Sequence, residues 1–111
     1  MWEQTRHGVV DIISGTGPLN METAEPLRKL LENRTAGGQP RLVLDCRNIA
    51  LIDSAGLELL LDTRDACILR GGQFHLSSLN ALCRDILHIT GVLEHFEVYN
   101  DSVAASGSFS Q

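Results

Sequence analysis

Short apolar runs and longer segments with helical spacing alternate along this chain. The runs are rich in branched and aromatic side chains and end near turn-forming residues, as is typical of strands. The longer segments place their apolar residues three or four positions apart, so that one helix face can be buried. The pattern predicts strands at residues 2–7, 9–14, 41–46, around 74–76 and 96–99, the first being the weakest and lying at a sheet edge.

Three helices are predicted between these strands. The first begins either at Thr23, which places Pro26 in the first turn, or at Asn20, which leaves Pro26 deeper at the cost of one backbone hydrogen bond. The second and third helices are each stopped by glycine. They are predicted at about residues 54–70 and 80–90, with a final helical turn at 103–105.

The resulting order, β-β-α-β-α-β-α-β-α, predicts a single α/β domain with a mixed, mainly parallel sheet packed with helices. The first two strands are close in sequence, so we expect them to be antiparallel. The domain is expected to span residues 1–105, followed by a flexible tail at residues 106–111. Partners of such sheets gather beyond the carboxyl ends of the strands, where we expect residues 47–54.

Composition narrows the kind of partner. The formal net charge is −5 and Lys29 is the only lysine, which argues against nucleic acid and against direct binding to an anionic membrane. No apolar run approaches the roughly 18 residues of a transmembrane helix, and no signal-peptide stretch is present, so a cytoplasmic protein is expected. Cys46, Cys67 and Cys83 lie in apolar segments without CxxC spacing, which predicts buried, reduced thiols. Neither metal-ligand spacing nor a phosphate-binding glycine motif occurs, so no metal or cofactor is expected.

The candidate site lies within residues 51–61, where Asp53 and Ser54 stand at the start of the second helix. Both residue types are good helix N-caps, and a plain cap is one explanation for Ser54. A catalytic serine needs a base within reach, yet no histidine is tied to Ser54 and the GxSxG pattern is absent, so no enzymatic activity is expected. Asp45 also ends an apolar strand, like the acceptor of a receiver domain. The acidic residues and the lysine that such a domain requires are missing, so Asp45 is expected to bond loop N–H groups.

The stretch resembles the signature of the STAS domain, specifically of bacterial anti-sigma factor antagonists. In that family a strand ends in an aspartate, an apolar loop follows, and then come Asp-Ser, a small residue, Gly and Leu. Asp45, residues 49–52 and residues 53–57 match this pattern in order, and the resemblance covers about residues 3–105.

This resemblance implies that the protein captures an anti-sigma factor that is also a serine kinase, and thereby frees a sigma factor. Phosphorylation of Ser54 would end the capture, and a serine phosphatase acting on phospho-Ser54 would restore it. Asn20 stands where many members carry an aspartate, and Ala55 replaces a frequent Ser or Thr. The expected partner-binding residues are Asn20, Asp53, Ser54, Ala55, Gly56, Leu57 and Glu58.

Two further expectations remain open at this point. The alternative function is a STAS accessory subunit of a membrane transporter, for example of an ABC-type lipid transport system, which would hold an ATPase subunit with the same face. The exposed first strand could also pair with a second copy in a homodimer.

Phosphorylation of Ser54 is physically suited to a switch. A phosphate adds roughly −1.5 to −2 charges. The helix N-terminus favours such a charge by about 0.3–1 kcal/mol, so the fold should survive. A partner surface packed against the neutral hydroxyl would instead meet a dianion beside Asp53, and like-charge juxtaposition can cost several kcal/mol.

Overall fold

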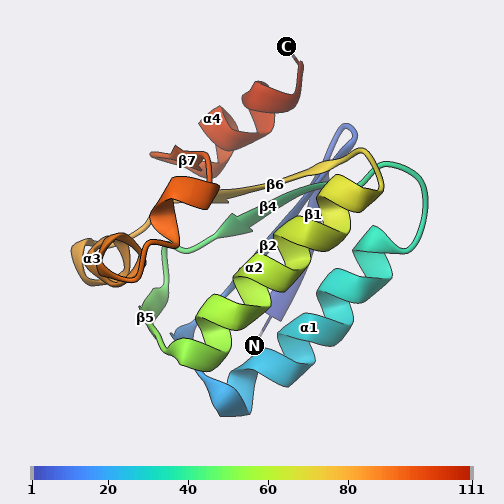
Figure 1. Cartoon of the computed structure of the whole chain (residues 1–111). Coiled ribbons are helices and arrows are strands. Elements are labelled where there is room, and N and C mark those ends of the chain that lie inside the picture. The colour runs from blue at the N-terminus through green and yellow to red at the C-terminus, as the bar shows by residue number, and fades with distance from the viewer. Residues whose placement is uncertain (1, 111) are drawn as a thin grey trace.

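The computed structural model describes residues 2–110 and shows a mixed five-stranded sheet with helices on both faces (Figure 1). The strand order is β1-β2-β4-β6-β7. β1 is antiparallel to β2, and every other neighbouring pair in this sheet is parallel. The predicted α/β class and the antiparallel first pair are confirmed. The strands are β1 (Trp2–His7), β2 (Val10–Gly15), β4 (Arg41–Asp45), β6 (Gln73–Ser77) and β7 (Val98–Tyr99).

The interior contains two hydrophobic clusters, one on each face of the sheet. α1 (Met21–Thr35) and α2 (Ser54–Leu69) lie side by side over one face of the sheet, and the short α4 (Ser102–Gly107) packs on the other (Figure 1). The larger cluster fills the α1–α2 side and the smaller one lies under α4. α3 (Ala81–Ile89) sits beyond the end of the sheet. Among the described residues, no helix is long and apolar enough to cross a membrane.

A second, two-stranded sheet was not predicted from the sequence. β3 (Gly17–Leu19) pairs in parallel with β5 (Ile49–Ile52), so two stretches expected as loops are strands. Each is three or four residues long, which is too short to display a clear two-residue period. Their pairing is visible only once the larger sheet has brought the two chain segments together.

The first helix begins after Asn20, and the alternative start at Thr23 is wrong. The Asn20 side-chain oxygen accepts hydrogen bonds from the backbone N–H groups of Glu22 (3.0 Å) and Thr23 (3.1 Å). In return the Thr23 hydroxyl accepts the Asn20 N–H at 2.9 Å, which completes a capping box. These bonds satisfy two of the free N–H donors of the first turn and that of Asn20 itself, and Pro26 lies inside the helix.

The three cysteines are free and buried, as predicted. Burial raises the pKa of Cys67 to about 11 and also raises the pKa of Cys46. Thiols rather than reactive thiolates are therefore present at neutral pH.

The end of the chain folds back onto the sheet. After α4 a 3₁₀-helix, η2 (Ser108–Ser110), brings Phe109 against His75, with ring centroids 4.5 Å apart in a stacked arrangement. The Ser108 hydroxyl lies 2.9 Å from His75 Nδ1. The flexibility expected of residues 106–111 stays a prediction, and Gln111 lies outside the described residues.

The burial of His75 makes the stability of the fold depend on pH. Burial lowers the pKa of His75 below its usual 6.5, with Glu97 opposing the shift. His75 therefore binds a proton more readily in the unfolded chain than in the folded one. The contribution of neutral, buried His75 to stability is complete above about pH 6.5 and is lost as the pH falls below it. We expect the Tm to fall between about pH 7.5 and about pH 5.5, and to fall less in His75→Gln. Thermal melts of both proteins check this, with the exposed His7→Gln as the matched control. An equal fall in His75→Gln would contradict it.

Candidate functional site

Ser54 opens α2 with a free, exposed hydroxyl, because Asp53 is the residue that caps the helix. Asp53 Oδ1 accepts the Gly56 N–H at 3.1 Å, and the Asp53 carbonyl accepts the Leu57 N–H at 2.9 Å. The Ser54 side chain is exposed and forms no hydrogen bond with any residue between 2 and 110. The plain-cap explanation of this serine is therefore wrong, and its hydroxyl faces solvent.

The small second sheet joins the starts of α1 and α2. Leu19 is paired with Ile52, and the Asp53 N–H donates to the Leu19 carbonyl at 3.1 Å. The next residue after each strand, Asn20 and Asp53, is the N-cap of the following helix. Two helix N-termini thus lie together at one end of the molecule (Figure 1). Their positive dipole ends favour an anion near Ser54.

Asn80 connects β5 to the start of α3 by hydrogen bonds. It caps α3 by accepting the Cys83 N–H at 2.7 Å, and its amide nitrogen donates to the carbonyls of Ile49 (3.1 Å) and Ala50 (3.2 Å). β5 is therefore fixed between β3 and the start of α3, which gives Ser54 a defined position. Nothing in the local sequence pattern signals the bonds of Asn80 to residues about 30 positions earlier.

Gly56 allows the two helix starts to approach. A Cβ placed on it would lie 2.8 Å from Leu19 Cγ and from Ile52 Cγ2, and 2.9 Å from the Leu19 carbonyl oxygen. Real Cβ atoms do not come this close, so a glycine is required by packing. This is the physical reason for the glycine two residues after Ser54.

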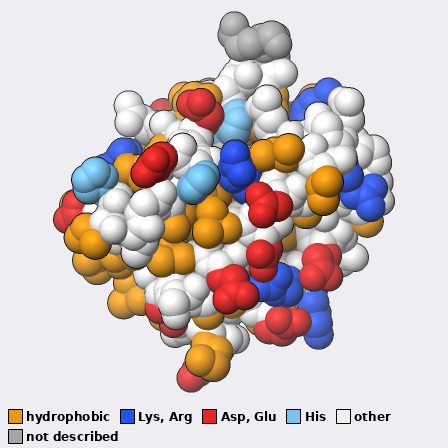
Figure 2. All heavy atoms as spheres, in the orientation of Figure 1, with side chains coloured by type: hydrophobic (Ala, Val, Ile, Leu, Met, Phe, Trp, Pro, Cys, Tyr) orange, Lys and Arg blue, Asp and Glu red, His pale blue; other side chains and the backbone are white. Residues whose placement is uncertain are grey.

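Exposed apolar side chains border the serine. Leu51 is 39% exposed on β5, and Met21, which follows the Asn20 cap, is 78% exposed. Glu58 is exposed one helical turn after Ser54, while Ala55 and Leu57 are partly buried. Figure 2 shows acidic and basic side chains mixed over the α1–α2 face, and hydrophobic side chains gathered toward α3. Exposed apolar area (Leu51 and Met21) and acidic side chains (Asp53 and Glu58) thus both occur near Ser54. Met21 lies outside the residues that the sequence predicted for the site.

The structure brings together all seven residues predicted for the site. Gly56 is buried, and the side-chain oxygen of Asn20 is occupied with capping. The Asn20 amide nitrogen makes no hydrogen bond with residues 2–110 and can donate to a partner. Asp45 belongs elsewhere: its Oδ1 accepts the Arg47 N–H at 3.1 Å, as predicted for a strand-end residue. Within the described part of the chain, no three His, Cys, Asp or Glu side chains are grouped as metal ligands.

Comparisons with known proteins point to one family. The family model described as the STAS domain matches residues 2–105. BtrV of Bordetella bronchiseptica, which carries the name of an anti-sigma factor antagonist, is 32% identical over 93 residues, covering 84% of this chain and 80% of its own length. The anti-sigma F factor antagonist of Paenibacillus polymyxa is 24% identical over 104 residues, covering 93% of this chain and 89% of its own.

Solved structures share the fold. A Thermotoga maritima protein, also named an anti-sigma factor antagonist, superimposes with a TM-score of 0.93 at 21% identity, covering 99% of this chain and 95% of that one. SpoIIAA in its unphosphorylated form gives a TM-score of 0.83 at 14% identity, covering 100% and 98%.

Proposed function

The chain belongs to the STAS domain family, and we propose that it is an anti-sigma factor antagonist controlled by phosphorylation of Ser54. In this proposal the unphosphorylated protein binds an anti-sigma factor that is also a serine kinase, in the cytoplasm. The protein acts as a binding module and a kinase substrate, without catalysis of its own. A serine phosphatase returns phospho-Ser54 to the binding form.

The free hydroxyl of Ser54 carries the proposal. Asp53 supplies the cap, so a kinase can modify Ser54 without removing any hydrogen bond of the fold. The adjoining starts of α1 and α2 favour the added charge. Two of the relatives above are named as antagonists of anti-sigma factors, which supports this kind of partner.

The switch acts at the contact with the partner. Leu51 and Met21 offer apolar area beside the hydroxyl, and apolar area at the centre of an interface contributes much of its binding energy. A phosphate placed among them would have to lose its water when the partner binds, with Asp53 and Glu58 nearby to repel it further. We expect dissociation without unfolding.

Phosphorylation by the serine kinase is expected to modify Ser54 and no other residue. Incubation of the protein with the kinase and ATP should add one phosphate, located on Ser54 by mass spectrometry of its peptides. Ser54→Ala should accept none, yet still bind the kinase, because its N-terminal cap is intact. A kinase that binds the folded protein but leaves Ser54 unmodified would count against phosphorylation control and favour the transporter-subunit alternative.

A further inference from the structure

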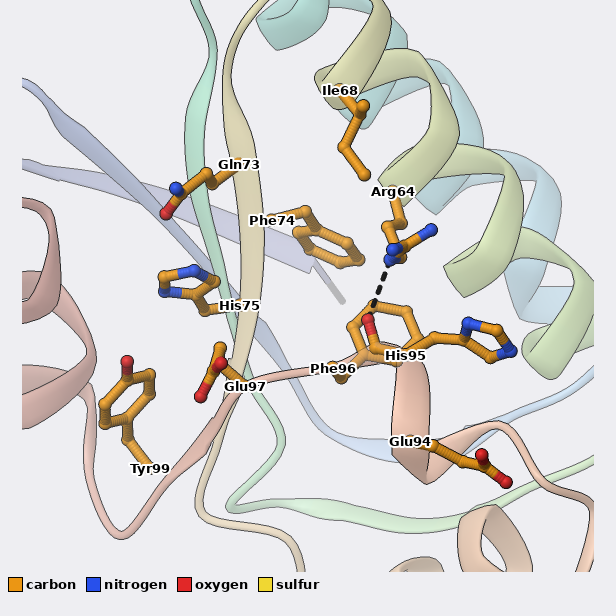
Figure 3. A pocket seen from close by; sticks show the side chains of 10 residues that line it. All are labelled: Arg64, Ile68, Gln73, Phe74, His75, Glu94, His95, Phe96, Glu97 and Tyr99. Atoms are coloured by element: carbon orange, nitrogen blue, oxygen red, sulfur yellow. Dashed lines mark hydrogen bonds between the residues drawn. The ribbon is translucent and has the colours of Figure 1, made fainter.

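A wedge-shaped groove opens beside the first half of β6 (Figure 3). It lies near the C-terminal end of α2, whereas Ser54 is at the N-terminal end of that helix. Its volume is about 510 Å³. One wall is formed by Gln73, Phe74 and His75 of β6, and the other by residues 94–97, which diverge from the sheet. Arg64 and Ile68 of α2 line its inner side.

The backbone of β6 is open in this groove. Leu76 donates its N–H to the Glu97 carbonyl at 3.1 Å, and Ser78 donates to the Tyr99 carbonyl at 2.9 Å, so alternate residues face β7. Phe74, two residues before Leu76, points its N–H and C=O the same way. Within residues 2–110 the pairing of β6 with β7 starts only at Leu76. An open strand edge of this kind is a template for another strand.

The groove offers a different chemistry on each side of that edge. On the α2 side the rings of Phe74 and Phe96 meet edge to face, with centroids 5.8 Å apart, and Ile68 is 52% exposed. On the α4 side lie His75 and Glu97 (Figure 3). Consecutive residues of an added strand point to opposite faces, so one would meet the aromatic side and the next Glu97.

The α4 side presents acceptors and negative charge. The Ser108 hydroxyl donates its only hydrogen to the Ala105 carbonyl at 2.6 Å, so it accepts from His75 Nδ1. The neutral ring of His75 then has Nε2 as an acceptor, beside the exposed Glu97 carboxylate.

The arginine that lines the groove is already engaged. Arg64 donates from Nε to the His95 carbonyl at 2.7 Å and pairs with Asp65 at 3.4 Å. The charge on the α4 side of the groove is therefore complementary to a cationic side chain of a ligand.

We propose that this groove binds an extended peptide segment of a partner protein by strand addition to β6. An apolar residue of the peptide packs on Phe74 and Phe96, and the adjacent Arg or Lys pairs with Glu97. The backbone N–H and C=O of Phe74 provide the main-chain hydrogen bonds, as in other cases of strand addition.

This site is separate from Ser54. Arg64 and Ile68 lie ten and fourteen residues along α2, which is about 15–21 Å at the helical rise per residue. The proposal does not rest on the antagonist function, and both surfaces could be occupied together.

Titration of the isotope-labelled full chain with two blocked peptides tests the proposal by NMR. One peptide alternates Val with Arg and the other alternates Val with Glu. We expect the Phe74 amide and residues 94–97 to shift with the Val–Arg peptide, which should bind about tenfold more tightly than the Val–Glu peptide. Glu97→Lys should reverse this preference. The same change at the exposed Glu3 of β1, at the opposite edge of the sheet, should leave it unaltered.

Backbone recognition is tested separately. A Val–Arg peptide that is N-methylated along its backbone keeps its side chains but loses its donors, and it should no longer shift Phe74. Equal binding of the two parent peptides, shifts confined to β1, or full binding of the methylated peptide would each overturn the proposal. The titrations with the two parent peptides and with the methylated peptide use the parent protein, so they do not depend on the folding of any variant.

Discussion

Ser54→Asp is expected to leave the protein folded and to weaken its binding to the anti-sigma factor by about a hundredfold or more. The new carboxylate lies at the first position of α2, next to Asp53 and bordered by the exposed Leu51 and Met21. In the free protein it is solvated, and the helix N-terminus favours it by about 0.3–1 kcal/mol, so the Tm should be unchanged or slightly raised. In the complex it is desolvated beside a like charge. Calorimetric titration of the partner and thermal melts measure the two effects.

Two control variants separate charge from shape. Ser54→Asn introduces a side chain of the size of Asp without charge, and should lose much less affinity than Ser54→Asp. Asn33→Asp adds the same charge at an exposed position near the other end of α1, and should bind as the parent does. If Ser54→Asn loses as much affinity as Ser54→Asp, shape rather than charge controls the contact, and the electrostatic mechanism is wrong.

The site could be located from the sequence, but the sequence did not show whether Asp53 or Ser54 caps the helix. Ser and Asp are both good caps, so the pair at 53–54 did not reveal which side chain bonds the helix. The structure assigns this task to Asp53, whose oxygen meets the Gly56 N–H. The distinction matters for function because only an uncommitted hydroxyl can be modified without loss to the fold.

Features that depend on distant segments could not be predicted. The pairing of β3 with β5 joins residues about 30 positions apart through two short strands, neither with its own periodicity. The groove beside β6 likewise arises because β7 is only two residues long and the chain before it turns away. By contrast, the sequence of the main strands and helices along the chain, including α1 and α2, follows from regular apolar patterns, which are a local property of the chain.

Gly56→Ala should destabilise the protein although alanine is the better helix former. By propensity alone the change would stabilise α2 by about 1 kcal/mol. The added Cβ would instead lie 2.8–2.9 Å from Leu19 and Ile52 atoms, one of them the carbonyl oxygen that accepts the Asp53 N–H. We expect a net loss of about 1–3 kcal/mol in the free energy of unfolding, measured by denaturant titration.

The matched control for this prediction is Gly107→Ala, in α4, where a Cβ would meet nothing within 4 Å. This variant should be as stable as the parent or slightly more so, since no close contact opposes the helix propensity of alanine. Relief of the clash at Gly56 requires Leu19 to move away from Asp53, so Gly56→Ala should also weaken partner binding through the displaced start of α2. A Gly56→Ala protein as stable as the parent would show that β3 and α2 can separate freely, and Ser54 would then lack the fixed position that the switch requires.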